Sequence, residues 1–174
     1  MRVTIETERL ILRNLRPGDE KAVYAWAGDP DVARYMIYPQ YRSEADGIEW
    51  LREREENADD PDDYDLGIVL RETGELIGSG GLVYQPDSDI WNMGYNIRKD
   101  MWGNGYVAEA MQAIIEEVRK TRKLRVLEAQ FAVENDKSRR VMEKLGMVYD
   151  RESSFEKFDR SAKFQAKTFR REFE

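Results

Sequence analysis

The segment YNIRKDMWGNGYVAEA, residues 95–110 of this 174-residue chain, has the spacing of an anion-binding turn. A strand is expected to end near Ile97, and an amphipathic helix to begin at about Tyr106. Gly103 and Gly105 fall between them. Glycines let the backbone approach a ligand closely, and the free N–H groups of a first helical turn attract an anion together with the helix dipole. A diphosphate is the natural occupant of such a turn.

Two named nucleotide motifs do not fit this segment. Ala108 stands where G-x-G-x-x-G requires its third glycine, and no lysine follows the second glycine as a Walker loop requires. Because ordinary turns also use paired glycines, the segment alone leaves a structural turn and a ligand-binding turn both open.

A second segment, VENDKSRRVMEKLGM at 133–147, places polar residues where an expected strand ends and a helix begins. Ser138 and Met142 lie one turn apart on one helical face. Asn135 could bond a ligand amide, and Ser138 could offer a hydroxyl proton. The alternative is that Asn135 caps the helix and Ser138 fills its first turn.

The elements expected around these segments form one mixed α/β domain over residues 1–174. Apolar residues recur at helical spacing within 107–122, whereas apolar and polar residues alternate within 127–133 as in a strand. A hairpin is expected at 66–84, with Gly74 in its turn. Strands are expected at 9–15, 66–70, 76–84, 91–97, 124–133, 147–158 and 163–173, and helices at about 17–27, 43–56, 106–122 and 137–145.

Two of the helices carry more detailed expectations. Gly28 and Pro30 are expected to stop the first helix. Ser43 is a good N-cap for the second helix, from which Ile48 and Leu51 are expected to pack inward.

Composition and charge exclude several classes of protein. The chain is 41% hydrophobic, and its formal charge of 28 − 35 = −7 does not suit generic nucleic-acid binding. No apolar run is long enough for a membrane span. Without histidine or cysteine it has no disulfide, thiol nucleophile, zinc finger, Ser-His triad or histidine base, and no metal site is expected. The N-terminus MRVTIETERL lacks the apolar core of a secretion signal, so a cytoplasmic location is expected.

An acidic run, EREENADDPDDYD at 53–65, has two interpretations. It forms either a solvated helix end and loop, or an acidic lip that attracts a positively charged acceptor.

Taken together, these segments resemble the GNAT superfamily of acetyl-CoA-dependent N-acetyltransferases, and most closely the branch with the ribosomal-protein N-terminal acetyltransferases. The T-E-R-L-x-L-R opening strand of that branch reads TERLILR at 7–13, and its G-Y pair is Gly94-Tyr95. Its loop W-G-x-G-Y-A-x-E-A reads WGNGYVAEA at 102–110. Its N-x-x-S-x-x-x-x-x-K-x-G-[FM] helix is matched by Asn135, Ser138, Lys144, Gly146 and Met147.

The resemblance implies a GNAT fold, with a mixed, mostly antiparallel sheet of about seven strands flanked by about four helices. The fourth and fifth strands, here Trp91–Ile97 and Leu124–Val133, would splay into a V that holds the acyl-CoA pantetheine. Acetyl-CoA would be the co-substrate, and Val107 would replace a smaller alanine in the loop that holds its pyrophosphate. The implied acetyl-CoA contacts are Ile97, Arg98, Trp102, Gly103, Asn104, Gly105, Tyr106, Val107, Ala108 and Asn135.

The resemblance also implies direct attack of a primary amine on the thioester. Many members use a tyrosine as the acid for the departing thiolate, but Met142 stands at that position, so Ser138 is expected to act instead. The branch often has a glutamate base where this chain has Asn92. An acid elsewhere, such as Glu128, is the alternative base.

The expected acceptor is a protein N-terminal amine or a small-molecule amine, and the expected state is a monomer or a homodimer. Tyr35, Tyr38 and Tyr41 either line the acceptor pocket or pack a helix connection. Two rival functions remain open: an acyl-CoA-binding module without efficient catalysis, and a phosphate-binding or interaction domain unrelated to CoA.

Overall fold

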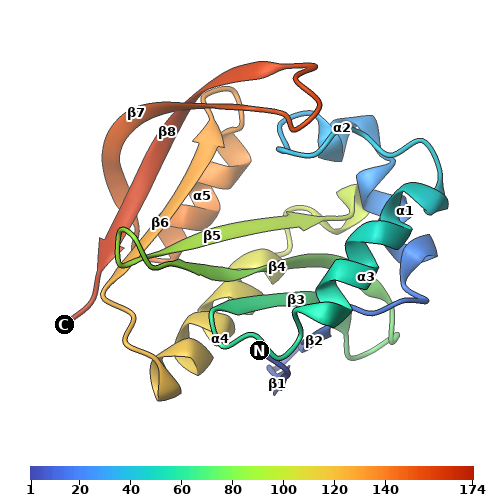
Figure 1. Ribbon diagram of the computed structural model, residues 1–174, viewed down its shortest axis with the longest axis horizontal. Coiled ribbons are helices and arrows are strands. Elements are labelled where there is room, and N and C mark those ends of the chain that lie inside the picture. Colours follow the sequence, from blue (N-terminus) through green and yellow to red (C-terminus); the bar gives the residue numbers. More distant parts are fainter.

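The computed structural model describes residues 1–174 and contains one eight-stranded sheet with the order β1-β2-β3-β4-β5-β6-β8-β7 (Figure 1). All neighbouring strands are antiparallel except β5 and β6, which are parallel. The strands are β1 (Thr4–Glu6), β2 (Leu10–Asn14), β3 (Asp63–Leu70), β4 (Leu76–Gln85), β5 (Ile90–Ile97), β6 (Val126–Ala132), β7 (Val148–Glu156) and β8 (Lys163–Glu172).

Helices cover both faces of this sheet. A cluster of 25 buried residues joins one face to α4 and α5, and a cluster of 8 joins the other face to α1–α3. Adjacent residues such as Ile68 and Val69 belong to different clusters, because side chains alternate along a strand. The helices are α1 (Glu20–Ala27), α2 (Pro30–Ala33), α3 (Ile48–Glu56), α4 (Tyr106–Thr121) and α5 (Asp136–Lys144), with 3-10 turns η1 (Glu44–Gly47) and η2 (Lys99–Met101).

The strands β5 and β6 separate along their length. They pair only at Trp91 with Leu127 and at Asn92 with Glu128. Beyond this point β5 continues to pair with β4 up to Ile97, while β6 continues to pair with β8. Figure 1 shows the two strands diverging. The expected V-shaped splay is therefore confirmed, and its inner strand edges have no ladder partners.

The structure has one strand and one α-helix more than expected. The additional strand, β1, has three residues, too few for alternation to show in the sequence. The additional helix, α2, begins at Pro30, whereas this proline was expected only to stop the preceding helix. Proline suits the first position of a helix because the N–H that it lacks would be unpaired there. Asp29 caps α2 by accepting from the N–H of Asp31 at 2.9 Å.

The second expected helix differs in its start and in one buried residue. Ser43 caps the 3-10 turn η1 rather than the α-helix, with Asp46 as its capping-box partner. Leu51 is buried as expected, but Ile48 is 53% exposed. The two residues lie about 60° apart around the helix, and α3 buries only Leu51. No helix of the chain has the length and apolarity to cross a bilayer.

Candidate active site

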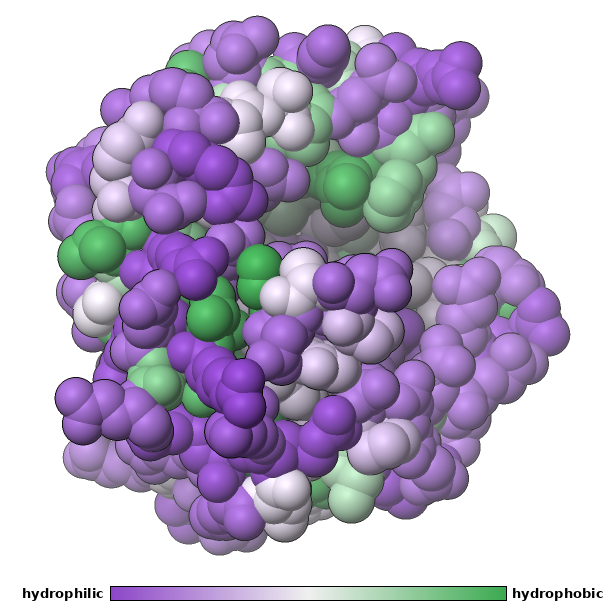
Figure 2. Space-filling view, turned by 60° about the vertical axis from the view of Figure 1, so that its left-hand side comes forward, coloured by the Kyte–Doolittle hydropathy of each residue, from purple (hydrophilic) through white to green (hydrophobic).

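A pocket of about 180 Å³ lies in the gap between β5 and β6. Met93 and Tyr95 reach it from the face that carries α4 and α5, whereas Gly94 and Gln130 reach it from the opposite face. The pocket therefore passes through the sheet. Figure 2 shows a hollow in the molecular surface with hydrophobic residues along part of its rim. The lining residues are Tyr35, Met36, Ile37, Met93, Gly94, Tyr95, Gln130, Phe131, Asn135, Ser138, Met142 and Phe155.

Ser138 and Tyr95 form a hydroxyl pair in this pocket. The Tyr95 Oη lies 2.7 Å from the Ser138 Oγ and 3.0 Å from the Ser138 carbonyl oxygen. Burial raises the pKa of Tyr95 well above its ordinary value, so the phenol keeps its proton at neutral pH. The phenol has one proton to donate, either to the Ser138 carbonyl oxygen or to the Ser138 Oγ. In the second arrangement the serine hydroxyl is free to donate into the pocket. The sequence showed Tyr95 only as part of a strand motif, and its hydrogen bond with Ser138 was not predicted.

Asn135 lies beside Ser138 with an uncommitted side chain. It occupies the N-cap position of α5, but its side chain makes no capping hydrogen bond. Its backbone turns the chain instead, because its N–H donates to Ala132 at 2.8 Å and its carbonyl accepts from Ser138 at 3.1 Å. The capping alternative is therefore not observed, and the amide lines the pocket.

The turn at 98–105 holds a row of unpaired backbone donors. Gly103 and Gly105 have φ values of +80° and +77°, which L side chains rarely adopt. Gly105 is the N-cap of α4 and provides no side chain to cap it. The N–H groups of residues 103–108 donate to no acceptor in the chain. They lie at the N-terminus of α4, which follows β5 and Tyr95 along the chain.

The opening motif TERL and the loop motif meet in one contact. Arg9 donates to Glu109 at 2.7 Å and to the Asn104 carbonyl at 2.8 Å, and its guanidinium lies 4.4 Å from the Tyr106 ring centroid. Thr7 donates to the same glutamate at 2.6 Å. Burial opposes the charge on Glu109, but these hydrogen bonds hold its pKa below the ordinary value. Arg9 thus stabilises the loop through its contacts with Glu109 and the Asn104 carbonyl.

Among the other residues predicted to contact acetyl-CoA, some have only their backbone groups available and others have side chains that are already paired. Ile97 and Val107 are buried, so only their backbone is available to a ligand. The Val107 side chain therefore points into the core and does not crowd the loop. The Arg98 guanidinium is held by Asp100 and Glu75 at 2.6 and 3.0 Å.

Trp102 and Asn104 stabilise the loop itself. The Trp102 indole N–H donates to the Ile97 carbonyl at 3.1 Å, and Lys137 of α5 lies 3.5 Å from its ring centroid. The Asn104 amide donates to the Met101 and Trp102 carbonyls. The part-buried Ala108, like its neighbours, offers its N–H at the first turn of α4.

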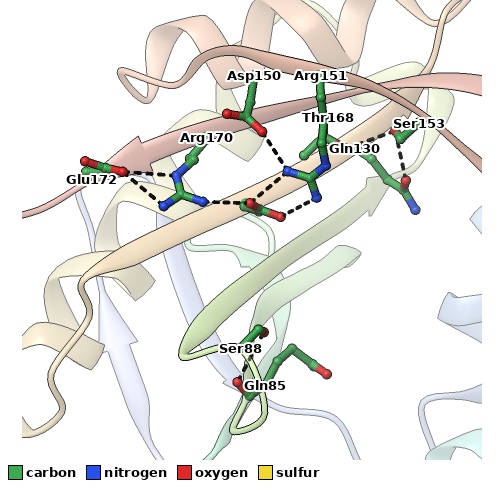
Figure 3. A network of polar contacts seen from close by, with 10 residues as sticks. Gln85, Ser88, Gln130, Asp150, Arg151, Ser153, Thr168, Arg170 and Glu172 are labelled. Atoms are coloured by element: carbon green, nitrogen blue, oxygen red, sulfur yellow. Dashed lines mark hydrogen bonds and ion pairs between the residues drawn. The ribbon is translucent and has the colours of Figure 1, made fainter.

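Glu128, the alternative base, is the partner of Asn92 in the β5–β6 register. Arg151 binds both Glu128 oxygens at 3.0 Å, and Arg170 adds a contact at 3.2 Å (Figure 3). Arg151, followed by Arg170, holds the pKa of Glu128 below its ordinary value although partial burial opposes this. Glu128 is therefore a poor proton acceptor at neutral pH.

The structure also bears on the two questions left open for the acceptor side, the acidic run at 53–65 and the three tyrosines. None of the acids at 53–65 lines the pocket, and Arg54 pairs with Asp63 and Asp65 at 2.8 and 3.4 Å. Residues 53–62 form the end of α3 and the loop after it, as in the first interpretation, whereas Asp63 and Asp65 belong to β3. Among the three tyrosines, Tyr35 lines the pocket, whereas Tyr38 and Tyr41 pack on each other with ring centroids 5.7 Å apart.

Comparisons with known proteins agree with this geometry. The family model for the Acetyltransferase (GNAT) domain matches residues 9–148. A relative from Bacillus licheniformis, "Uncharacterized N-acetyltransferase p20", is 25% identical over 143 residues, covering 82% of this chain and 80% of p20.

Solved structures share the fold. A ribosomal-protein-S5-alanine acetyltransferase from Vibrio fischeri matches with a TM-score of 0.81 and 16% identity, covering 98% of this chain and 96% of that one. The self-immunity acetyltransferase MccE, solved with acetyl-CoA and AMP, matches with a TM-score of 0.80 and 12% identity, covering 96% and 94%. With a family match over most of its length and an N-acetyltransferase among its relatives, this chain belongs to the GNAT acetyltransferase family and is an N-acetyltransferase.

Proposed function

We propose that this enzyme takes its acetyl group from acetyl-CoA and transfers it to a primary amine by direct attack. The observation that carries the proposal is the row of unpaired N–H groups at residues 103–108, next to a pocket that passes through the sheet. A diphosphate fits these donors, because the α4 dipole and the glycine backbone both favour an anion there. The acetyl-CoA bound to MccE, which has the same fold, supports this choice of donor.

The splay would hold the rest of the acetyl-CoA. Beyond Asn92 the edge of β5 that faces β6 has no strand partner, so pantetheine amides can pair with it. The Asn135 amide can bond the same arm. The pocket volume of about 180 Å³ is below the 300–1,000 Å³ typical of complete ligand sites. It therefore takes only the reacting end of the molecule and the amine that attacks it.

Ser138 would donate a proton or a hydrogen bond to the departing thiolate. As the amine nitrogen bonds to the acetyl carbon, the bond from that carbon to sulfur breaks, and the thiolate needs a proton or a hydrogen bond. In the arrangement in which Tyr95 donates to the serine Oγ, the Ser138 hydroxyl donates to the thiolate, and the proton it gives up is replaced by the one that leaves the amine through water. Tyr95 then serves to position Ser138, because it is hydrogen-bonded to the serine oxygen and not to the sulfur.

The acceptor would reach the site with a neutral amine. Asn92 cannot accept a proton, and Glu128 is committed to two arginines. We therefore propose an acceptor of low pKa, such as a protein N-terminal amine or a weakly basic small-molecule amine, with the proton leaving through water. Such an α-amine has a pKa of about 7.7–8.0 and is already about a tenth neutral at pH 7.

The test is acetyl-CoA binding in a matched pair of glycine variants. Acetyl-CoA at 100 times its Kd should stabilise the protein by about 2.7 kcal/mol and raise Tm by several degrees. Gly105→Val should abolish this shift. Gly74→Val is the control, because Gly74 has nearly the same φ of +75° but lies in the β3–β4 turn. A Cβ would meet nothing within 4 Å at Gly74 and only an Arg9 nitrogen at 3.7 Å, an ordinary contact, at Gly105.

Equal acetyl-CoA affinity in both glycine variants would contradict the proposed site. Binding without CoA release from a panel of amines would instead indicate an acyl-CoA-binding module.

A further inference from the structure

The β7–β8 hairpin is fastened to the segment that follows α2. The Lys157 Nζ donates to the carbonyl oxygens of Ala33, Met36 and Tyr38 at 2.8, 2.7 and 3.0 Å. The neighbouring Phe158 N–H donates to the Ile37 carbonyl at 2.9 Å. Figure 1 shows the tip of the hairpin beside α2.

These contacts use all the hydrogen-bond donors of the buried Lys157 ammonium. Lys157 is 9% exposed, and its three donors meet three backbone oxygens. A buried ammonium and buried carbonyls are each costly to leave unpaired. The position of residues 33–38 is therefore tied to that of the hairpin.

The fastened segment forms one wall of the pocket. Tyr35, Met36 and Ile37 line it together with Phe155 of β7. Phe164 of β8 packs on both aromatic rings, with centroids 5.7 Å from Tyr35 and 5.2 Å from Phe155. All of these side chains lie on the side of the pocket opposite Ser138. This wall presents large hydrophobic surface and no free charge.

Two further observations bear on the ligand that this wall could bind. Ile37 is 42% exposed and Phe158 is 73% exposed, although both side chains are large and hydrophobic. Contiguous exposed apolar residues mark ligand or partner sites. Arg151 and Arg170 pair with Glu128, Asp150 and Glu172, and the Arg34 guanidinium lies 5.4 Å from the Tyr35 ring centroid. None of the residues that line the pocket itself is charged, so a charged acceptor side chain would have no counter-ion within it.

We propose that the acceptor side of the pocket selects amines that carry an apolar aliphatic or aromatic group next to the nitrogen, and that Lys157 positions the wall that recognises this group. The inference rests on the proposed function, because the amine must enter opposite the acetyl-CoA. A cavity of about 150 Å³ takes one benzene ring, so about 180 Å³ suits the reacting atoms and one such group.

The test compares acceptors that differ only in the first residue. Short peptides with N-terminal leucine, phenylalanine, serine or aspartate, together with the corresponding amino-acid amides, separate a peptide acceptor from a small-molecule acceptor. We expect kcat/KM for leucine and phenylalanine to exceed that for aspartate about 10-fold or more in the preferred series. Binding of the same compounds to the CoA complex, measured by calorimetry, gives the same comparison without turnover.

Two variants test the wall itself. Ile37→Asp changes a partly exposed side chain and should remove most of the preference for leucine over aspartate. Lys157→Met should raise the acceptor KM several-fold while the Kd for acetyl-CoA stays within about 2-fold. Equal kcat/KM or equal affinity for leucine and aspartate, or an unchanged preference in Ile37→Asp, would overturn this inference with acetyl-CoA binding intact. Failure of the wild-type protein to bind acetyl-CoA would instead refute the proposed function.

Discussion

The two sides of the pocket are built in different ways. The proposed acetyl-CoA side relies on backbone groups of one continuous segment, residues 95–108, and on the first turn of α5. The acceptor side consists of side chains from the segment after α2 and from β7, joined by a lysine that reaches across 124 residues of sequence. One side thus depends on main-chain conformation and the other on packing.

This difference explains why one side can be read in the sequence. Backbone recognition requires left-handed φ values at fixed positions, and these favour glycine at 103 and 105. An apolar wall needs only hydrophobic residues of suitable volume, which many sequences satisfy. The acetyl-CoA side therefore has a motif, whereas the acceptor side has none.

Ser138→Ala should have the largest effect, and it should be confined to the rate. We expect kcat to fall by about 10²–10⁴ because the thiolate loses its donor. The Kd for acetyl-CoA and the acceptor preference should stay unchanged, since neither wall moves. Steady-state kinetics and thermal shift measure these quantities. Wild-type turnover in this variant would show that water supplies the proton.

The pH dependence should show that the acceptor side has no base. The α-amine and lysine pKa values of about 7.7–8.0 and 10.4 differ by about 2.5 units, which predicts a preference of about 300-fold for an α-amine at pH 7. The rate should rise with pH, because deprotonation produces the nucleophile, and level off near the pKa of the acceptor. The measurement is kcat/KM from pH 6 to 10 for an N-terminal peptide and an N-blocked lysine peptide.

Two results would contradict this pH prediction: comparable rates on both peptides at pH 7, or a plateau near pH 6. Asn92→Glu extends the test to position 92: a shift of the profile towards lower pH would show that this position faces the amine.

Tyr95→Phe should have a smaller effect that depends on Ser138. Loss of one hydrogen bond of about 0.5–1.5 kcal/mol predicts a decrease in kcat of up to about 10-fold. In the Ser138→Ala background the same change should cost almost nothing, because there is no hydroxyl left to position. The two single variants and the double variant form the experiment. Additive effects would show that Tyr95 acts independently of Ser138.

Arg9→Ala should have the smallest effect and should change only the affinity for acetyl-CoA. The guanidinium holds Glu109 and the Asn104 carbonyl, so its loss should weaken acetyl-CoA binding a few-fold. Arg13→Ala is the matched control, because Arg13 lies in β2, which begins directly after Arg9, but pairs with Asp19 at 2.9 Å. Titration with acetyl-CoA compares them. A changed acceptor preference in Arg9→Ala would contradict the separation of the two sides.

Sequence patterns predicted most elements because their signals are local. The stripe of apolar residues in α4 and the glycine turn of the β3–β4 hairpin each lie within a short stretch of chain. The misses have local causes as well. Three residues of β1 carry no detectable alternation, and Pro30 can end one helix and begin the next. Ile48 was misplaced because the width of a buried stripe depends on what packs against it.

The sequence by itself determined the glycine turn ahead of α4, since φ values at glycine and helix spacing depend on neighbouring residues. Only the tertiary structure decided which side chains meet in the site. Tyr95 reaches Ser138 across 43 residues, Arg9 reaches Glu109 across 100, and Lys157 reaches Ala33 across 124. Sheet register and helix packing create these contacts, and no short pattern encodes them. The same register places Glu128 between two arginines and so removes it as a base.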